Sequence, residues 1–185
     1  MNLKRYGGVI TGLICLIVLI SGCVSMEDLT SGYLSGDNLS NSTGKITAYG
    51  VSFEYPSGWF AHADNTTGDN TITASKDFGF NNVQFQVTVW NNDGMSEDSA
   101  VNLLRENDSP GWKKISSNEL TIDNKTAYED VYLVNDSHFS KIMRISSIIL
   151  VKNDKSYMMF LQAPDDEFDS ERANFDIILN SFRVL

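Results

Sequence analysis

The sequence has few of the residues on which catalytic and covalent sites usually depend. Its 185 residues include only two cysteines, two histidines and three prolines. Cys15 lies in an N-terminal apolar segment and Cys23 lies three residues after it, so no later thiol is available for a disulfide, a zinc site or a nucleophile. His62 and His138 fit no recognised metal spacing, and there is no phosphate loop or nucleophile elbow. We therefore expect a protein that is not an enzyme and holds no cofactor or metal.

Basic residues are also scarce. The chain has 14 Lys and Arg against 24 Asp and Glu, which gives a formal charge of −10 and a pI of about 4.5. This charge repels a phosphate backbone, and no basic stripe overrides it, so nucleic acid is excluded as an expected partner. A hydrophobic content of 42% and the chain length are typical of one globular domain.

The N-terminus has the pattern of an export signal. Lys4 and Arg5 precede an apolar run over residues 9–20. The four residues that end at Cys23, Ile-Ser-Gly-Cys, resemble the prokaryotic lipobox, whose cysteine receives a lipid and becomes the mature N-terminus. We predict a lipoprotein signal peptide over residues 1–22 and a lipid-anchored protein on the extracytoplasmic face of the cell membrane.

The alternative is an uncleaved helix over residues 7–24, which at about 18 residues is just long enough to span a membrane. Residues 23–46 are rich in Ser, Gly and Asn and predict a flexible tether. Cleavage before Cys23 would leave 12 basic residues against 24 acidic residues, so the exported domain favours a partner with a basic surface.

The remainder, residues 47–185, predicts a single domain rich in strands. Residues 83–90 alternate apolar and polar side chains, and Asp123-Asn124 and Asn153-Asp154 predict the turns of two hairpins. The predicted strands are 51–55, 71–75, 83–90, 115–122, 126–134, 141–152 and 157–163.

Two segments have helical spacing instead. Ser96 and Pro164 are each followed by acidic residues and then by apolar residues at helical spacing. Several strands are apolar on both faces, which indicates a sheet covered on both sides. We predict an α+β fold with an antiparallel sheet of six to seven strands flanked by helices.

Residues 51–59 (VSFEYPSGW), the paired hairpins and the closing residues 178–184 (ILNSFRV) resemble the PsbP-like domain family over about residues 49–185. The resemblance implies an α/β/α sandwich and a non-enzymatic accessory or protein-interaction domain. The family includes photosystem subunits and prokaryotic lipoproteins, and the lipobox favours the lipoprotein branch.

Three residues are candidates for contact with a partner or ligand. Trp59 and His62 follow the opening strand, and His62 could pair with Asp64 in a loop. Trp90 is out of phase with the apolar residues of its strand, so it either packs under a helix or is an exposed contact residue. The alternative function is a module that holds a small apolar ligand between the sheet and one helix, near Trp59, Trp90 and Phe182; an enzyme is the third choice.

Two acidic or oxygen-rich segments have alternative interpretations as calcium sites. The acids from Asp165 to Glu171 are better explained by a helix start, and residues 91–94 by a turn into the next helix.

Six Asn-x-Ser/Thr sequences are candidate glycan acceptors that mark exposed loops: Asn38, Asn41, Asn65, Asn107, Asn124 and Asn135.

Overall fold

The computed structural model describes residues 43–65, 68–77, 83–105, 111–135 and 139–185. The predicted signal peptide over residues 1–22 and most of the predicted tether lie outside these ranges. So do Cys23, Asn38, Asn41, Asn107 and His138. Within the described ranges, neither helix has the length and apolar content that crossing a membrane requires.

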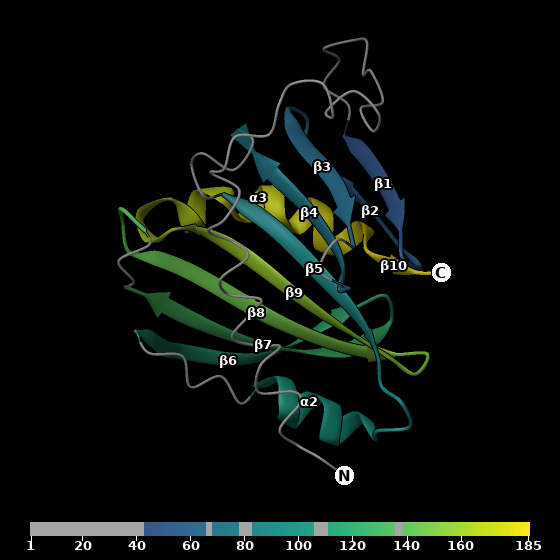
Figure 1. Ribbon diagram of the computed structural model, residues 1–185. Coiled ribbons are helices and arrows are strands. Elements are labelled where there is room, and N and C mark those ends of the chain that lie inside the picture. Colours follow the sequence, from purple (N-terminus) through teal and green to yellow (C-terminus); the bar gives the residue numbers. More distant parts are fainter. Residues whose placement is uncertain (1–42, 66–67, 78–82, 106–110, 136–138) are drawn as a thin grey trace. The chain divides into compact units, whose positions relative to one another are not determined.

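The described part of the chain forms two sheets and two helices (Figure 1). The strands are β1 (Gly44–Ala48), β2 (Val51–Tyr55), β3 (Trp59–Asp64), β4 (Asn70–Lys76), β5 (Gln84–Asn91), β6 (Trp112–Ile122), β7 (Lys125–Val134), β8 (Met143–Lys152), β9 (Lys155–Pro164) and β10 (Arg183–Val184). The helices are α2 (Glu97–Arg105) and α3 (Asp165–Ser181).

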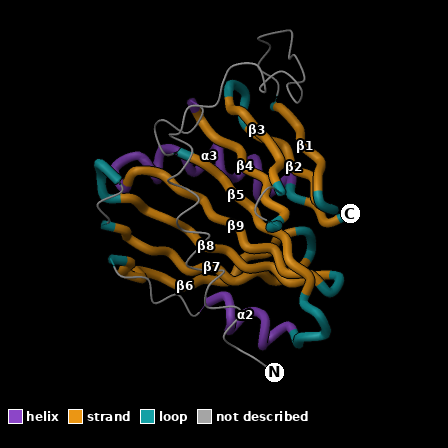
Figure 2. The backbone as a smooth tube through the Cα atoms, viewed as in Figure 1, coloured by secondary structure: helices purple, strands orange, loops and turns teal. Residues whose placement is uncertain are grey.

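The larger sheet has seven antiparallel strands in the order β3-β4-β5-β9-β8-β7-β6 (Figure 2). Two-residue turns join β6 to β7 and β8 to β9. Asp123 and Asn124 have φ of 50° and 60°, and Asn153 and Asp154 have φ of 53° and 58°. Positive φ at both central positions gives the turn twist that matches a hairpin, and Asn and Asp tolerate it well. Both predicted hairpins are confirmed.

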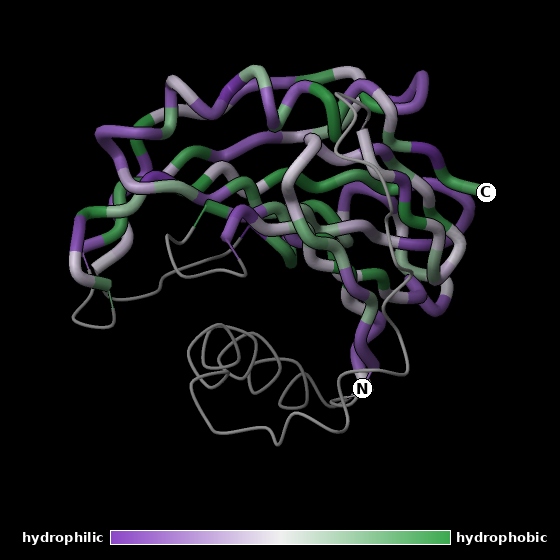
Figure 3. Tube along the Cα trace, turned by 90° about the horizontal axis from the view of Figure 1, so that it is seen from above, coloured by the Kyte–Doolittle hydropathy of each residue, from purple (hydrophilic) through white to green (hydrophobic). Residues whose placement is uncertain are grey.

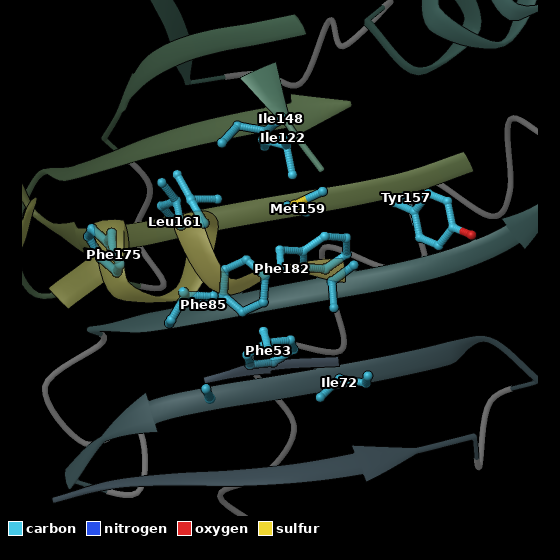
Figure 4. Packing of buried hydrophobic residues seen from close by; sticks show 14 of the residues in the cluster. Phe53, Ile72, Phe85, Ile122, Ile148, Tyr157, Met159, Leu161, Phe175 and Phe182 are labelled. Carbon is cyan, nitrogen blue, oxygen red and sulfur yellow. The ribbon is translucent and has the colours of Figure 1, made fainter. Parts of the chain in front are cut away.

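One face of this sheet is covered by α3 and by the small sheet β1-β2-β10. The ring of Phe53 on β2 lies edge-on to Phe85 on β5 at 5.0 Å and stacks on Phe182 at 6.2 Å, and all three side chains are at most 1% exposed (Figure 4). Ser181 joins the helix end to the small sheet, because its Oγ accepts a hydrogen bond from the Glu54 N–H at 2.8 Å. We call this side of the large sheet the core face.

The opposite side, which we call the α2 face, carries α2 at one end. Ala100 and Val101 of α2 pack against Ile149 and Val151 of β8. Because side chains alternate along a strand, the residues between the core positions point to this face, and hydrophilic and hydrophobic segments alternate along the strands in Figure 3. The register places on it Thr73, Gln86, Trp90, Phe160, Ser147, Asp130 and Ser117.

The C-terminal strand is held by the turn between β6 and β7. Asp123, whose side chain is 11% exposed, accepts hydrogen bonds from Lys152 Nζ at 2.6 Å and from the Val184 N–H at 2.9 Å. Burial alone would raise the pKa of Asp123, but these two donors outweigh it and hold the pKa below its ordinary value. The carboxylate therefore stabilises the fold above the ordinary Asp pKa and loses that effect as the pH falls through its lowered value.

Asp123→Asn should lower the free energy of unfolding at pH 7 by about 1–3 kcal/mol, since two donors lose a charged acceptor. Asparagine tolerates the positive φ of this turn, so the substitution tests the charge rather than the backbone. Urea unfolding of both proteins at pH 7 and pH 3 measures the effect. Equal stabilities at pH 7 would contradict the assigned role.

The predicted fold class is confirmed, and the differences concern two edge strands. β1 begins at Gly44, inside the range predicted as tether, and β3 occupies residues expected to form a loop after Trp59. Both strands alternate only over four residues, 45–48 in β1 and 61–64 in β3, which is too short a pattern to separate a strand from a loop. Each pairs with one neighbour, β1 with β2 and β3 with β4, and this pairing explains the strand conformation better than local sequence does.

Candidate functional site

The core face is packed with buried side chains, and it includes two of the three residues near which a ligand was predicted. Trp59 is 7% exposed and lies edge-on to Phe175 of α3 at 6.0 Å, while Phe182 is fully buried. The register places Trp90 opposite Ser156, on the other side of the sheet from Trp59 and Phe182. The prediction of a ligand held near these three residues was therefore wrong in its geometry, because the sheet separates them.

Two of the three predicted contact residues lie on the α2 face. Trp90 is half-buried, and its indole N–H donates to Asp69 at 3.3 Å. His62 is exposed and lies in strand β3 rather than in a loop. Trp59 belongs to the core, so the structure brings His62 and Trp90 to one face but does not bring all three residues together.

His62 and Asp64 point to the same face of β3 because they are two positions apart. Nearby protein partly desolvates the imidazole and lowers its pKa, while the negative charge of Asp64 opposes this. His62 is nevertheless exposed to solvent, and an exposed ring retains most of its hydration, so we assign it no pH-dependent role. Among the described residues, no group of three or more His, Cys, Asp and Glu side chains is arranged to hold a metal.

The most highly charged part of the α2 face is a cluster around Asp130 of β7, whose side chain is only 3% exposed. Arg105 at the end of α2 binds both carboxylate oxygens, with Nη2 at 2.5 Å and Nε at 3.0 Å. From β6, Lys114 Nζ donates at 2.8 Å and Ser117 Oγ donates at 2.6 Å. We call Asp130, Arg105, Lys114 and Ser117 the Asp130 cluster.

Aromatic rings surround this cluster. The Arg105 guanidinium lies 5.8 Å from the ring centroid of Tyr128, and Lys114 Nζ lies 5.6 Å from that of Tyr132. Trp112 lies edge-on to Tyr132, with 5.4 Å between ring centroids. The rings and the alkyl stems form an apolar wall around partly exposed cations, a combination of residue types enriched at binding interfaces.

The electrostatics of the cluster fix its charge state. Burial alone would raise the pKa of Asp130, but hydrogen bonds from Arg105, Lys114 and Ser117 outweigh it and hold the pKa well below its ordinary value. The same bonds raise the pKa of Lys114 and of Arg105. At neutral pH the cluster therefore contains one buried anion and two cations, whose side chains are 31% and 43% exposed.

Asp130 is not among the residues predicted from the sequence, although one sequence signal points to it. Glu129 and Asp130 are adjacent acids in the middle of an otherwise apolar strand. Adjacent side chains in a strand point to opposite faces, so a sheet covered on both sides must bury both carboxylates. Glu129 lies on the core face and is 4% exposed, and it accepts hydrogen bonds from Ser146 at 2.5 Å and Asn118 at 3.0 Å.

The acidic start of α3 follows the helix-start interpretation. Arg144 donates to Asp165 and Asp169 at 2.7 Å each, and Lys141 donates to Glu167 at 3.0 Å. These ion pairs with Lys141 and Arg144 explain the cluster of acids, so a bound metal ion is not needed to explain it. Residues 91–94 form the turn between β5 and α2, as expected, with Gly94 at φ 79°.

Three candidate glycan acceptors lie within the described ranges. Asn65, Asn124 and Asn135 are all exposed, at strand ends or in a turn. Exposure is required for glycan attachment but does not establish it, so glycosylation of these asparagines stays a prediction.

A comparison with known protein families finds a match for this chain. The sequence pattern of the PsbP-like protein family matches residues 12–184. No curated protein matches the chain significantly.

Solved structures give a similar result. Cyanobacterial PsbP (CyanoP) from Synechocystis sp. PCC 6803 is 17% identical with a TM-score of 0.56, and the alignment covers 84% of this chain and 99% of that one. A protein from Bacteroides thetaiotaomicron is 13% identical with a TM-score of 0.52 over 76% of this chain and 48% of that one. The Ran-binding protein Mog1p of Saccharomyces cerevisiae is 12% identical with a TM-score of 0.45, over 78% and 96% of the two chains. At these identities the likeness to the first two structures shows the fold alone.

Proposed function

Because the chain belongs to the PsbP-like protein family, we propose that it is a non-catalytic binding domain and an accessory component of a membrane or envelope complex. In this proposal, a lipid on Cys23 holds the domain at the extracytoplasmic face of the cell membrane. The partner is a protein that docks on the α2 face, at the Asp130 cluster. The excess of acidic residues in the chain favours a partner that is basic overall, while the groups that meet Arg105 and Lys114 themselves are hydrogen-bond acceptors.

The observation that carries the proposal is the difference between the two faces of the sheet. The core face is packed with aromatic and aliphatic side chains. The core face also buries the Glu129 carboxylate, which the neutral side chains of Ser146 and Asn118 satisfy. The α2 face differs because it buries the Asp130 carboxylate beside two cations and three aromatic rings. A buried ion pair adds little stability compared with apolar residues of similar size, so folding alone does not account for this arrangement. Partly exposed Arg and Lys side chains beside Trp and Tyr form a surface suited to a protein contact.

The chemistry of the cluster supports a binding role over a catalytic one. A general base works best when its pKa lies near the operating pH. Asp130 is instead held ionised by two cations and a hydroxyl, so it is a weak base at neutral pH. Its oxygens are already occupied by donors from α2 and β6, which suits an orienting role. We infer that Asp130 positions Arg105 and Lys114 at the surface.

Lys114→Ala should reduce capture of the partner by at least about tenfold, since an anchor at a desolvated contact typically contributes more than 1.4 kcal/mol. The matched control is Lys113→Ala, which removes an exposed lysine from the same strand on the opposite face. Chemical cross-linking of full-length protein on intact membranes, followed by mass spectrometry, identifies the partner and measures its yield. Equal loss in both variants would refute docking at the Asp130 cluster.

Cys23→Ser should move the protein from the membrane fraction to the soluble fraction. The predicted lipid is the only anchor in this proposal, and serine lacks the thiol that receives it. Fractionation of cells that express each form, with immunodetection, measures the distribution. Retention of the serine variant in the membrane fraction would instead support the uncleaved helix over residues 7–24. This outcome leaves docking on the α2 face open, since Lys114→Ala tests that contact separately.

A further inference from the structure

β6 is an edge strand of the large sheet, and over most of its length neither of its faces is covered (Figure 2). Among the described residues it pairs with β7 alone, and its 11 residues make it the longest described strand. Residues 113–119 are seven consecutive exposed positions. Side chains alternate between the two faces of a strand, so a layer packed on either face would bury every second one. This stretch of β6 therefore projects beyond the layers that pack on the sheet.

The hydrogen-bond pattern shows which backbone groups of β6 point away from β7. The Asn135 N–H donates to the Gly111 carbonyl at 3.2 Å, so Asn135 bonds toward the β6 side of β7. Every second residue of an antiparallel strand bonds to the same neighbour, so Glu129 bonds toward β6 as well. Its register partner, Asn118, and the residues two positions away on β6 therefore bond to β7. The outward N–H and C=O groups are those of the residues between them: Ser117, Glu119 and Thr121. Within the described ranges, these groups have no backbone hydrogen-bond partner.

Only the first part of this edge is protected against pairing with another strand. A bulge interrupts the register between Lys114 and Ser116, and Lys113 adds a second cation beside it. Bulges and lysines are devices that keep another strand from adding to a free edge. Residues 116–122 have a continuous register and contain no lysine, proline or bulge. We call residues 116–122 the open edge of β6.

We propose that the protein partner docks by adding an extended segment to the seven-stranded sheet, beside the open edge of β6. This inference rests on the proposed function, because it names how the partner reaches the Asp130 cluster, and Ser117 belongs to both. In this mode, backbone hydrogen bonds supply affinity, and the side chains along the edge select the sequence that binds. Glu119 is the charged residue of the open edge, and it is exposed. An opposite charge beside it stabilises a strand pair, so the occupant is an extended segment that contains Lys or Arg.

Two other occupants match the open edge less well. A second copy that paired antiparallel with the whole open edge would place its own Glu119 opposite Glu119. Like charges directly opposite each other destabilise a sheet. The predicted tether has three acidic residues and no basic residue before Lys45, so it offers no partner for this carboxylate.

The test compares Glu119→Pro with Glu119→Ala in full-length protein that is cross-linked on intact membranes. Both variants remove the carboxylate, but proline also removes the outward N–H and places its ring where the added strand must approach. We expect Glu119→Pro to capture at least about tenfold less partner than Glu119→Ala. Mass spectrometry of the unmodified protein's cross-links should place a segment with Lys or Arg beside β6.

Equal capture by the two variants, or capture of a second copy alone, would overturn strand addition. If Lys114→Ala still lost the partner in that case, docking at the Asp130 cluster would stand, so the two proposals can fail separately. Capture of no protein by any form would refute the proposed function itself, and this inference with it.

Amide exchange gives a second measurement, which does not depend on the folding of the proline variant. It uses the unmodified protein, free and cross-linked to its partner, with hydrogen exchange resolved to single residues by mass spectrometry. The amides of Glu119 and Thr121 should exchange at least about tenfold more slowly in the complex, because the added strand now binds them. The amides of Asn118 and Leu120 already bond to β7 and should change less. No added protection at Glu119 and Thr121 would contradict strand addition.

Discussion

Phe182→Ala should lower the free energy of unfolding by about 3–5 kcal/mol, the range for truncating a fully buried phenylalanine. The ring is 0% exposed and contacts Phe53 and Tyr157, each at 6.2 Å between ring centroids. It lies at the point where α3 ends, so the cavity would open between the helix end, the small sheet and β9. Denaturant unfolding followed by far-UV circular dichroism measures the loss.

Leu185→Ala is the matched control for this prediction. It shortens another large apolar side chain three residues further on, but Leu185 is 70% exposed. Its effect should stay within about 0.5 kcal/mol, as for most surface substitutions. A loss below about 1 kcal/mol for Phe182→Ala would contradict the assignment of this ring to the centre of the core.

The double variant Arg105→Ala/Lys114→Ala should destabilise the protein by about 3–5 kcal/mol at pH 7, because it leaves a buried carboxylate without a cation. Asp130 would retain only the Ser117 hydroxyl among its four donor contacts. Adding Asp130→Asn to this background should restore much of the lost stability, since the uncompensated charge is removed. No rescue by the asparagine would mean that the double variant acts through lost packing of α2.

The pH dependence of this variant follows from the same contacts. In the unmodified protein the pKa of Asp130 is lowered, so its stabilising effect is present above the unfolded Asp pKa of about 3.9 and is lost as the pH falls further. Without the two cations, burial dominates and raises the pKa. The carboxyl then protonates at higher pH, and the stability difference between the two proteins should shrink as the pH falls from 7 to 4. A difference that stays constant over this range would contradict the electrostatic explanation.

The hairpins and the last helix could be predicted from the sequence because their signals are local. Asp123-Asn124 and Asn153-Asp154 lie between segments rich in strand-forming residues, and Pro164 with its acids marks the helix start. β3 has a weaker signal: only residues 61–64 of its sequence, WFAHAD, alternate, and the segment becomes a strand by pairing with β4. Local sequence therefore predicts elements whose own turns and caps specify them, and misses elements that a neighbour specifies.

The site depended on contacts that sequence spacing does not reveal. Arg105 and Lys114 lie 25 and 16 positions from Asp130 and meet it through the packing of α2 and the register of β6. The aromatic candidates differ for a related reason. Trp90 lies in a predicted strand, so its phase was visible in the sequence, whereas Trp59 was expected outside a strand. The observed register turns Trp59 into the core and Trp90 to the α2 face.

The most direct test of docking on the α2 face is site-specific photo-cross-linking on intact membranes. A photoreactive residue replaces Glu119, which is exposed on β6 opposite Tyr128, or Asn180, which is exposed on α3. We predict that the Glu119 position captures one defined protein, that Lys114→Ala abolishes this capture, and that the Asn180 position does not capture it. Capture from Asn180 alone, or equal capture from both positions, would contradict the assignment of the α2 face as the binding surface.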